Sequence, residues 1–145
     1  MDVRKLHHVA VAVHDIHAAL GDYAEVLGLP RSEVVYLDSQ KVYATLIPVG
    51  DCEIELIQPA DPQGGVAKFL EKRGEALHHI CFQVDDVDAD LAALEQQGVS
   101  LIDKKSRPGL AGMVGFLHPR STRGVLTELC SPMHGAQGQH GEAKR

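Results

Sequence analysis

Hydrophobic and polar residues alternate with a period of two in two stretches of the chain, Leu6–Val13 and Leu77–Val84. Such alternation predicts β-strands that are buried on one face. In both stretches the bulky apolar side chains share one face, and a histidine with small or polar neighbours shares the other: Val9, Val11 and Val13 oppose His8, Ala10 and Ala12, and Ile80, Phe82 and Val84 oppose His79, Cys81 and Gln83. We expect the apolar face to pack under a helix and the histidine face to line a cavity.

A helical period follows each of these strands. Asp15 and Asp86 are suited to cap the first turn of a helix, and Gly28 and Gly98 are suited to end it. Between these residues the apolar positions recur at helical spacing: Ile16, Ala19, Leu20, Tyr23, Val26 and Leu27 in the first segment, and Val87, Leu91 and Leu94 in the second. A further short helix is expected at residues 64–74, with Val66, Phe69 and Leu70 buried.

Three more strands are expected after each main helix, separated by turn residues. They are predicted at residues 33–36, 41–48 and 52–58 in the first half, and at 101–104, 114–118 and 125–130 in the second, with Pro108-Gly109 and Arg123-Gly124 in turns. The predicted fold class is α+β. It consists of two βαβββ modules.

The two halves are copies of one sequence pattern. Leu6–Ile16 aligns without a gap with Leu77–Val87, 71 residues later, and Glu55–Pro59 resembles Glu128–Pro132. An internal repeat of this kind predicts two related structural units. We expect a single domain over residues 1–132, with module one at 5–60, the linker helix at 64–74 and module two at 75–132. Residues 133–145 are predicted to be a disordered tail.

Composition narrows the class of protein. The chain has 145 residues and a net charge of −6, which leaves no room for separate cofactor and substrate domains and disfavours nucleic acid as a partner. No stretch has the length and apolarity of a membrane span, so neither a membrane nor nucleic acid is an expected partner. The three cysteines are an odd number without a CxxC pair, which favours a reducing compartment. The predicted location is the cytoplasm.

Each module contributes one histidine from its first strand and one glutamate from its last. If a pseudo-twofold axis relates the modules, His8, Glu55, His79 and Glu128 converge on a common cavity floor. Two imidazoles and two carboxylates suit a divalent metal with mixed nitrogen and oxygen ligands. We expect one ion per site, with Co²⁺ the first choice and Ni²⁺, Mn²⁺, Fe²⁺ or Zn²⁺ as alternatives. An octahedral ion would leave positions open for a substrate.

The other histidines, and one glutamate, receive structural interpretations. His7 and His78 are placed on the back of their strands, His14 and His17 are expected to be exposed, and His118 is interpreted as a loop residue or a substrate contact. Glu53 shares the face of Glu55 but is expected to face solvent. His134 and His140 fall in the predicted tail.

These residues resemble the vicinal oxygen chelate superfamily, which includes the glyoxalases and bleomycin-resistance proteins, over residues 5–132. Within it, the motifs are similar to those of the methylmalonyl-CoA epimerase family: Leu6–Val13, Val49–Pro59, Ala67–Leu70, Gly74–Ile80, Phe116–Ser121 and Gly124–Leu129. The resemblance implies that the two modules form a curved mixed sheet around a metal site. It also implies that His8, His79 and Glu128 are metal ligands and that Glu55 fills the remaining position. It also implies an acyl-CoA substrate and a homodimer.

The implied activity is interconversion of the 2R and 2S forms of methylmalonyl-CoA by removal and return of the α-proton. A metal-stabilised enolate would be the intermediate. Glu128 is the first candidate acid/base and Glu55 the second. Tyr43, which stands where some epimerases have a glutamate, is a weaker candidate because a phenol is a poor base near neutral pH. Basic residues of the second half could meet the coenzyme phosphates: Lys104, Lys105, Arg107, Arg120 and Arg123.

Two other functions fit the same pattern. Glyoxalase I also combines two histidines with two glutamates, and acts on a glutathione hemithioacetal. A non-catalytic protein of the same fold would need a cavity but no metal. Dioxygenases of the superfamily are disfavoured, because they use two histidines and one carboxylate with an open side. The sequence does not decide the native metal, the second base, the acyl-chain specificity, or whether the modules pair within one chain.

Overall fold

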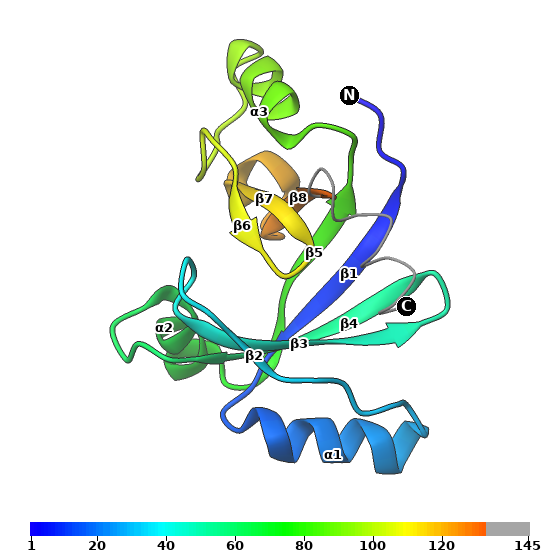
Figure 1. The fold of residues 1–145 in the computed structure, drawn as a ribbon. Helices are drawn as coiled ribbons and strands as arrows, with labels where there is room; N and C mark the ends of the chain where they lie inside the picture. The colour runs from blue at the N-terminus through cyan, green and yellow to red at the C-terminus, as the bar shows by residue number, and fades with distance from the viewer. Residues whose placement is uncertain (133–145) are drawn as a thin grey trace. The chain divides into compact units, whose positions relative to one another are not determined.

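The computed structural model describes residues 1–132, and it contains two successive βαβββ segments (Figure 1). The first comprises β1 (Lys5–Ala12), α1 (Ile16–Leu27), β2 (Val35–Leu37), β3 (Val42–Val49) and β4 (Cys52–Pro59). After α2 (Gly65–Arg73), the second comprises β5 (Ala76–Gln83), α3 (Val87–Gln96), β6 (Arg107–Gly109), β7 (Gly112–Leu117) and β8 (Thr127–Ser131), with a 3₁₀ turn at Pro119–Thr122. The predicted element order is confirmed. The predicted tail lies outside the described residues.

Contacts group the described residues into two units, one formed by residues 8–79 and one by residues 1–7 with residues 80–132. These limits cut through β1 and β5. The module limits predicted from the repeat stay a prediction. None of the helices within residues 1–132 is long and apolar enough to cross a membrane.

In the unit of residues 8–79, four strands lie in the order β2-β3-β4-β1. β1 runs parallel to β4, and the other neighbours are antiparallel. One face of this sheet packs on α1, through a core of five buried side chains: Val13, Ile16, Leu20, Ile47 and Leu56. Each large aliphatic side chain buried in this way contributes about 1.5–3 kcal/mol. The other face carries His8, Glu53 and Glu55 together with small and apolar side chains.

The predicted helix ends of α1 are confirmed. The Asp15 carboxylate accepts hydrogen bonds from the backbone N–H groups of His17 and Ala18, which have no partner within the helix. Gly28 ends the helix with a φ of 69°, in the left-handed region where an L side chain is strained. α1 is thereby fixed at both ends over the sheet that carries Glu55.

In the other unit the order is β5-β8-β7-β6, with β5 parallel to β8 and the remaining pairs antiparallel. α3 covers one face through five buried side chains: Val84, Val87, Leu91, Leu117 and Leu129. Asp86 caps α3 by accepting from the N–H of Ala89, as predicted. The halves therefore use the same arrangement, with a helix on one face of four strands.

The prediction of a strand at residues 101–104 is wrong. Only Leu101 forms a β-bridge there, with Leu117, and β6 lies at Arg107–Gly109, which was predicted as a turn. The Asp103 carboxylate accepts the backbone N–H of Phe116, and the carbonyl of Phe116 accepts from Asp103. At Asp103, a hydrogen bond to the side chain thus replaces one of the backbone hydrogen bonds that a β-ladder would have. Pro108 is tolerated in β6 because this strand ends the sheet of its unit.

Candidate metal centre

Three of the four predicted ligands meet within the unit of residues 8–79. His8 Nε2 lies 3.3 Å from His79 Nε2 and 3.3 Å from Glu55 Oε1, and His79 Nε2 lies 3.4 Å from the same oxygen. All three side chains are buried, with 1%, 5% and 7% of the surface of His8, His79 and Glu55 exposed. Two imidazole nitrogens and one carboxylate oxygen therefore converge on one point.

Strand register explains why residues far apart in sequence meet. β1 and β4 pair in parallel, with Ala10 beside Glu55, so His8 and Glu55 share the face turned away from α1. The neighbours of Glu55 on this face are apolar: Ala10 on β1, and Leu46 on β3. His79 joins them from the start of β5. The alternation seen in the sequence thus places the polar set opposite the helix core.

The histidines keep Glu55 ionised. Burial by itself raises the pKa of Glu55, but hydrogen bonds from His79 and His8, with the charges of both rings, outweigh it and hold the pKa well below its ordinary value. An ionised carboxylate is the form that binds a metal.

The donor set fits a divalent ion. Ligand atoms held about 2.0–2.2 Å from a metal stand about 2.8–3.6 Å apart for right-angled or tetrahedral geometry. The three separations in this cluster fall in that range. The three ligand atoms form a group able to hold a metal ion. His8, Glu55 and His79 are thus suited to a hard or borderline divalent ion.

The second ring nitrogen of His79 also has a neighbour. His79 Nδ1 lies 2.9 Å from Nδ1 of His78, the preceding residue. The His78 ring stands edge-on to Phe69 of α2, with centroids 4.8 Å apart. Sequence reasoning placed His78 on the back of its strand and missed this contact, although the adjacent histidines were visible.

Glu128 belongs to the other unit, where it is buried with 3% of its surface exposed. On the neighbouring strands it is paired with Cys81 of β5 and Phe116 of β7. Burial raises the pKa of the Cys81 thiol, and Cys130 and Glu128 raise it further. This raised pKa keeps Cys81 in its neutral thiol form. The place of Glu128 in the ligand set stays a prediction.

Tyr43 lies away from Glu55, and the expectation that Glu53 faces solvent is wrong. Tyr43 pairs with Gln58 rather than with a residue on the face of Glu55, so it lies on the opposite face of β3, with its ring 5.4 Å from Tyr36. Its position does not suit a base beside Glu55. Glu53 is buried with 5% exposed, not solvent-facing, because it shares the buried face of His8, its partner in the β1–β4 register.

The remaining polar residues mostly have structural contacts. His118 Nδ1 accepts the backbone N–H of Arg120, which supports its loop interpretation. Among the basic residues predicted to meet phosphates, Lys104 lies 2.9 Å from Glu95, and Arg107 lies 3.6 Å from Asp103. His14 and His17 are exposed, as expected. All three cysteines are free thiols.

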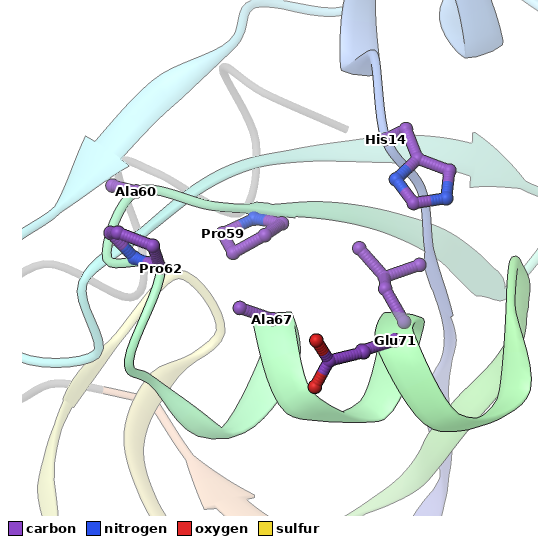
Figure 2. Close-up of a pocket in the computed structure, with 7 residues that line it drawn as sticks. His14, Pro59, Ala60, Pro62, Ala67 and Glu71 are labelled. Atoms are coloured by element: carbon purple, nitrogen blue, oxygen red, sulfur yellow. The ribbon is translucent and has the colours of Figure 1, made fainter.

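A pocket of about 360 Å³ lies elsewhere in the unit of residues 8–79, beside α2 (Figure 2). It is lined by His14, Pro59, Ala60, Pro62, Ala67, Leu70 and Glu71. None of the metal-centre residues contributes to it. The chemistry of the His8, Glu55 and His79 cluster is therefore separate from this pocket.

The model of the Glyoxalase/Bleomycin resistance protein/Dioxygenase superfamily matches residues 7–116, and the chain belongs to this superfamily. Its fold is the glyoxalase fold, as the resemblance implied.

Within this superfamily, the chain is similar to several methylmalonyl-CoA epimerases. The chain is 35% identical to the mitochondrial methylmalonyl-CoA epimerase of Mus musculus over 127 residues, covering 86% of this chain and 71% of the relative. A variant of Streptomyces coelicolor methylmalonyl-CoA epimerase, solved in complex with 2-nitronate-propionyl-CoA, has a TM-score of 0.85 and 31% identity, covering 92% of this chain and 97% of that one. An uncharacterized Bacillus subtilis protein is 38% identical, covering 95% and 99%.

Proposed function

We propose that the protein is a metal-dependent epimerase that interconverts the 2R and 2S forms of methylmalonyl-CoA. The observation that carries the proposal is the buried cluster of His8, Glu55 and His79, in a chain whose named relatives are epimerases of this substrate. An acyl-CoA substrate is further supported by the acyl-CoA complex of the Streptomyces relative.

His8, Glu55 and His79 would hold the ion, with Glu128 as the fourth ligand. A divalent ion bound there supplies a Lewis acid for the charge that develops on the thioester oxygen when the α-proton leaves. We expect one ion per site, with Co²⁺ as the first choice. The burial of the three ligands excludes water, which strengthens electrostatic interactions at the site.

Proton transfer requires a base on each side of the α-carbon. We assign Glu128 to one side, because it is a buried carboxylate and Cys81, the neutral thiol beside it, does not compete for the proton. Glu55 is the candidate for the other side. Its lowered pKa favours the ligand role, since a general base works best with a pKa near the working pH.

The direct test is incubation of the Co²⁺-loaded protein with methylmalonyl-CoA in D₂O, with the α-proton followed by ¹H NMR. We expect exchange of this proton and equilibration of the 2R and 2S epimers to be much faster than in the sample without protein. A second portion of the same protein preparation is incubated in parallel with the glutathione hemithioacetal of methylglyoxal. Isomerisation of the hemithioacetal without α-proton exchange would show a glyoxalase I instead.

A control variant separates catalysis from binding. His8→Ala with His79→Ala removes both nitrogen ligands, and we expect it to lose exchange and Co²⁺ binding together. If the wild type binds no metal, and the double variant binds the acyl-CoA as tightly as the wild type, the protein is a non-catalytic binder of the same fold.

A further inference from the structure

We propose that Arg107 binds the free carboxylate of the acyl group, and that it thereby selects malonyl-type thioesters over thioesters that lack this carboxylate. The inference rests on the proposed function, because it takes Glu128 as the acid/base at the α-carbon. Sequence reasoning grouped Arg107 with the residues for the coenzyme phosphates. Its position on the sheet favours the acyl end of the substrate instead.

Arg107 lies on the same face of its sheet as Glu128. In the β6–β7 pair Arg107 stands opposite Val114, and two residues further along β7 Phe116 stands opposite Glu128 of β8. Opposed residues share a face, and so do residues two apart in one strand. Gly115, between them on β7, points to the other face, where α3 packs. Arg107 and Glu128 therefore flank Phe116 on the face turned away from α3.

Two contacts hold the Arg107 guanidinium over this face. Its Cζ lies 5.8 Å from the centre of the Phe116 ring, and its Nη2 lies 3.6 Å from the Asp103 carboxylate. The same carboxylate accepts the backbone N–H of Phe116, which fixes Asp103 to β7. The Arg107 side chain is 35% exposed, so a bound molecule can reach it. A planar guanidinium held in this way is well suited to bind a carboxylate.

The spacing of the strands sets what the guanidinium can reach. β7 lies between β6 and β8 (Figure 1), and neighbouring strands are about 4.8 Å apart, so the backbones of Arg107 and Glu128 are about 10 Å apart. The guanidinium covers part of this distance, because it lies over Phe116, the cross-strand neighbour of Glu128. An acyl group held over Phe116 therefore extends from the proposed acid/base to the guanidinium.

The acyl carboxylate fits this place better than the coenzyme phosphates do. In methylmalonyl-CoA the carboxylate is bonded directly to the α-carbon, whereas the phosphates follow the whole pantetheine arm on the far side of the thioester. When the α-carbon lies beside Glu128, the nearest anionic group of the substrate is thus its carboxylate. Arg107 also offsets the repulsion between that carboxylate and an ionised Glu128.

The test compares two ligands that differ in this carboxylate alone. Propionyl-CoA is methylmalonyl-CoA without the carboxylate, and it carries the same coenzyme phosphates. Dissociation constants for both are measured by calorimetry on the Co²⁺-loaded wild type, Arg107→Gln and Arg107→Lys. The Gln variant removes the positive charge, and the Lys variant keeps it without the planar fork. Arg31→Gln, at an exposed arginine of the other unit, is the matched control.

A loss specific to the carboxylate is the expected result. We expect Arg107→Gln to bind methylmalonyl-CoA about 10–100-fold more weakly than the wild type, and propionyl-CoA within about threefold of it. Arg107→Lys should fall between the two for methylmalonyl-CoA, and Arg31→Gln should match the wild type for both ligands.

Two results would overturn the inference. An arginine that binds a phosphate, or one that only packs on Phe116, changes the affinity for both ligands by the same factor in Arg107→Gln. A wild type that binds methylmalonyl-CoA no more tightly than propionyl-CoA also overturns it, and this comparison needs no variant.

The proposed function is tested separately by α-proton exchange in the wild type. Exchange in the wild type, together with an equal loss for both ligands in Arg107→Gln, removes the carboxylate site and leaves the epimerase. A carboxylate-specific loss in Arg107→Gln without exchange in the wild type removes the epimerase and leaves a protein that binds malonyl-type thioesters.

Discussion

The two halves of the chain share one order of strands and helices, but they differ in the residue that their third strand places on the side of the sheet that faces the helix. Thr45 on β3 and Gly115 on β7 occupy matching places, each opposite a buried leucine, Leu56 or Leu129. The Thr45 hydroxyl donates to the carbonyl of Glu33 and lies 2.6 Å from Ser32 Oγ, which ties down the loop after α1. Gly115 instead leaves room for α3.

The faces that carry the glutamates also differ. Glu55 is flanked by Ala10 and Leu46, whereas Glu128 is flanked at the matching places by Cys81 and Phe116. Glu55 Oε1 lies 3.3 Å from His8 Nε2 and 3.4 Å from His79 Nε2, and both histidines belong to its own unit. The repeat thus fixes where a carboxylate stands on the sheet, while its neighbours decide what that carboxylate can do.

The largest expected effect comes from exchanging the two carboxylates for amides. Glu128→Gln should lower the α-proton exchange rate about 10²–10⁴-fold, because it removes the proposed acid/base. Glu55→Gln should act first on Co²⁺ affinity, because its carboxylate lies against both histidines. Exchange kinetics and Co²⁺ titration on both variants check this. Full exchange activity in Glu128→Gln would remove that residue from proton transfer.

A smaller effect is expected where the halves differ under their helices. A Cβ at Gly115 would lie 2.8 Å from Leu91 Cδ1 and 3.3 Å from Val87 Cγ1, so Gly115→Val should destabilise by about 1–3 kcal/mol through overpacking. Thr45→Val is nearly isosteric and should lose about 1–2 kcal/mol, from its hydrogen bonds alone. Urea unfolding measures both. A larger loss of stability in Thr45→Val than in Gly115→Val would contradict this order.

The smallest effect concerns the hydrogen bonds between Asp88 of α3 and Ser106 in the second half. Asp88, in the first turn of α3, accepts from the backbone N–H of Ser106 at 2.7 Å and from its hydroxyl at 2.8 Å. These bonds, the backbone one first, lower the pKa of Asp88. A lowered pKa stabilises the fold above the unfolded pKa of about 3.9, and this stability is lost as pH falls through the folded value.

Asp88→Asn should therefore be less stable than the wild type at neutral pH, by up to about 1 kcal/mol because the side chain is exposed. The difference should vanish in acid. Thermal unfolding from pH 7 to pH 3 checks this. The first turn of α1 has no acidic residue and therefore no counterpart of Asp88. A difference between variant and wild type that grew on acidification would contradict this explanation.

Periodicity predicted most of the fold because it reports local burial. Alternation in the first strand of each half and the Asp caps were enough to place β1, α1, β5 and α3. The strand at residues 101–104 failed because the Asp103 side chain replaces a backbone partner, which no periodic pattern reveals. Repetition was likewise enough to select His8, Glu55 and His79. It could not show the direction of Tyr43, which depends on register, or the contact between His78 and His79, which depends on ring rotation.

The measurement that tests the central claim most directly is the α-proton exchange rate of methylmalonyl-CoA in D₂O as Co²⁺ is titrated into metal-free protein. The account predicts that the rate rises with bound Co²⁺, saturates at one ion per site, and falls to the protein-free rate when a chelator removes the metal. Equal exchange with and without metal, or stoichiometric Co²⁺ binding without exchange, would contradict it.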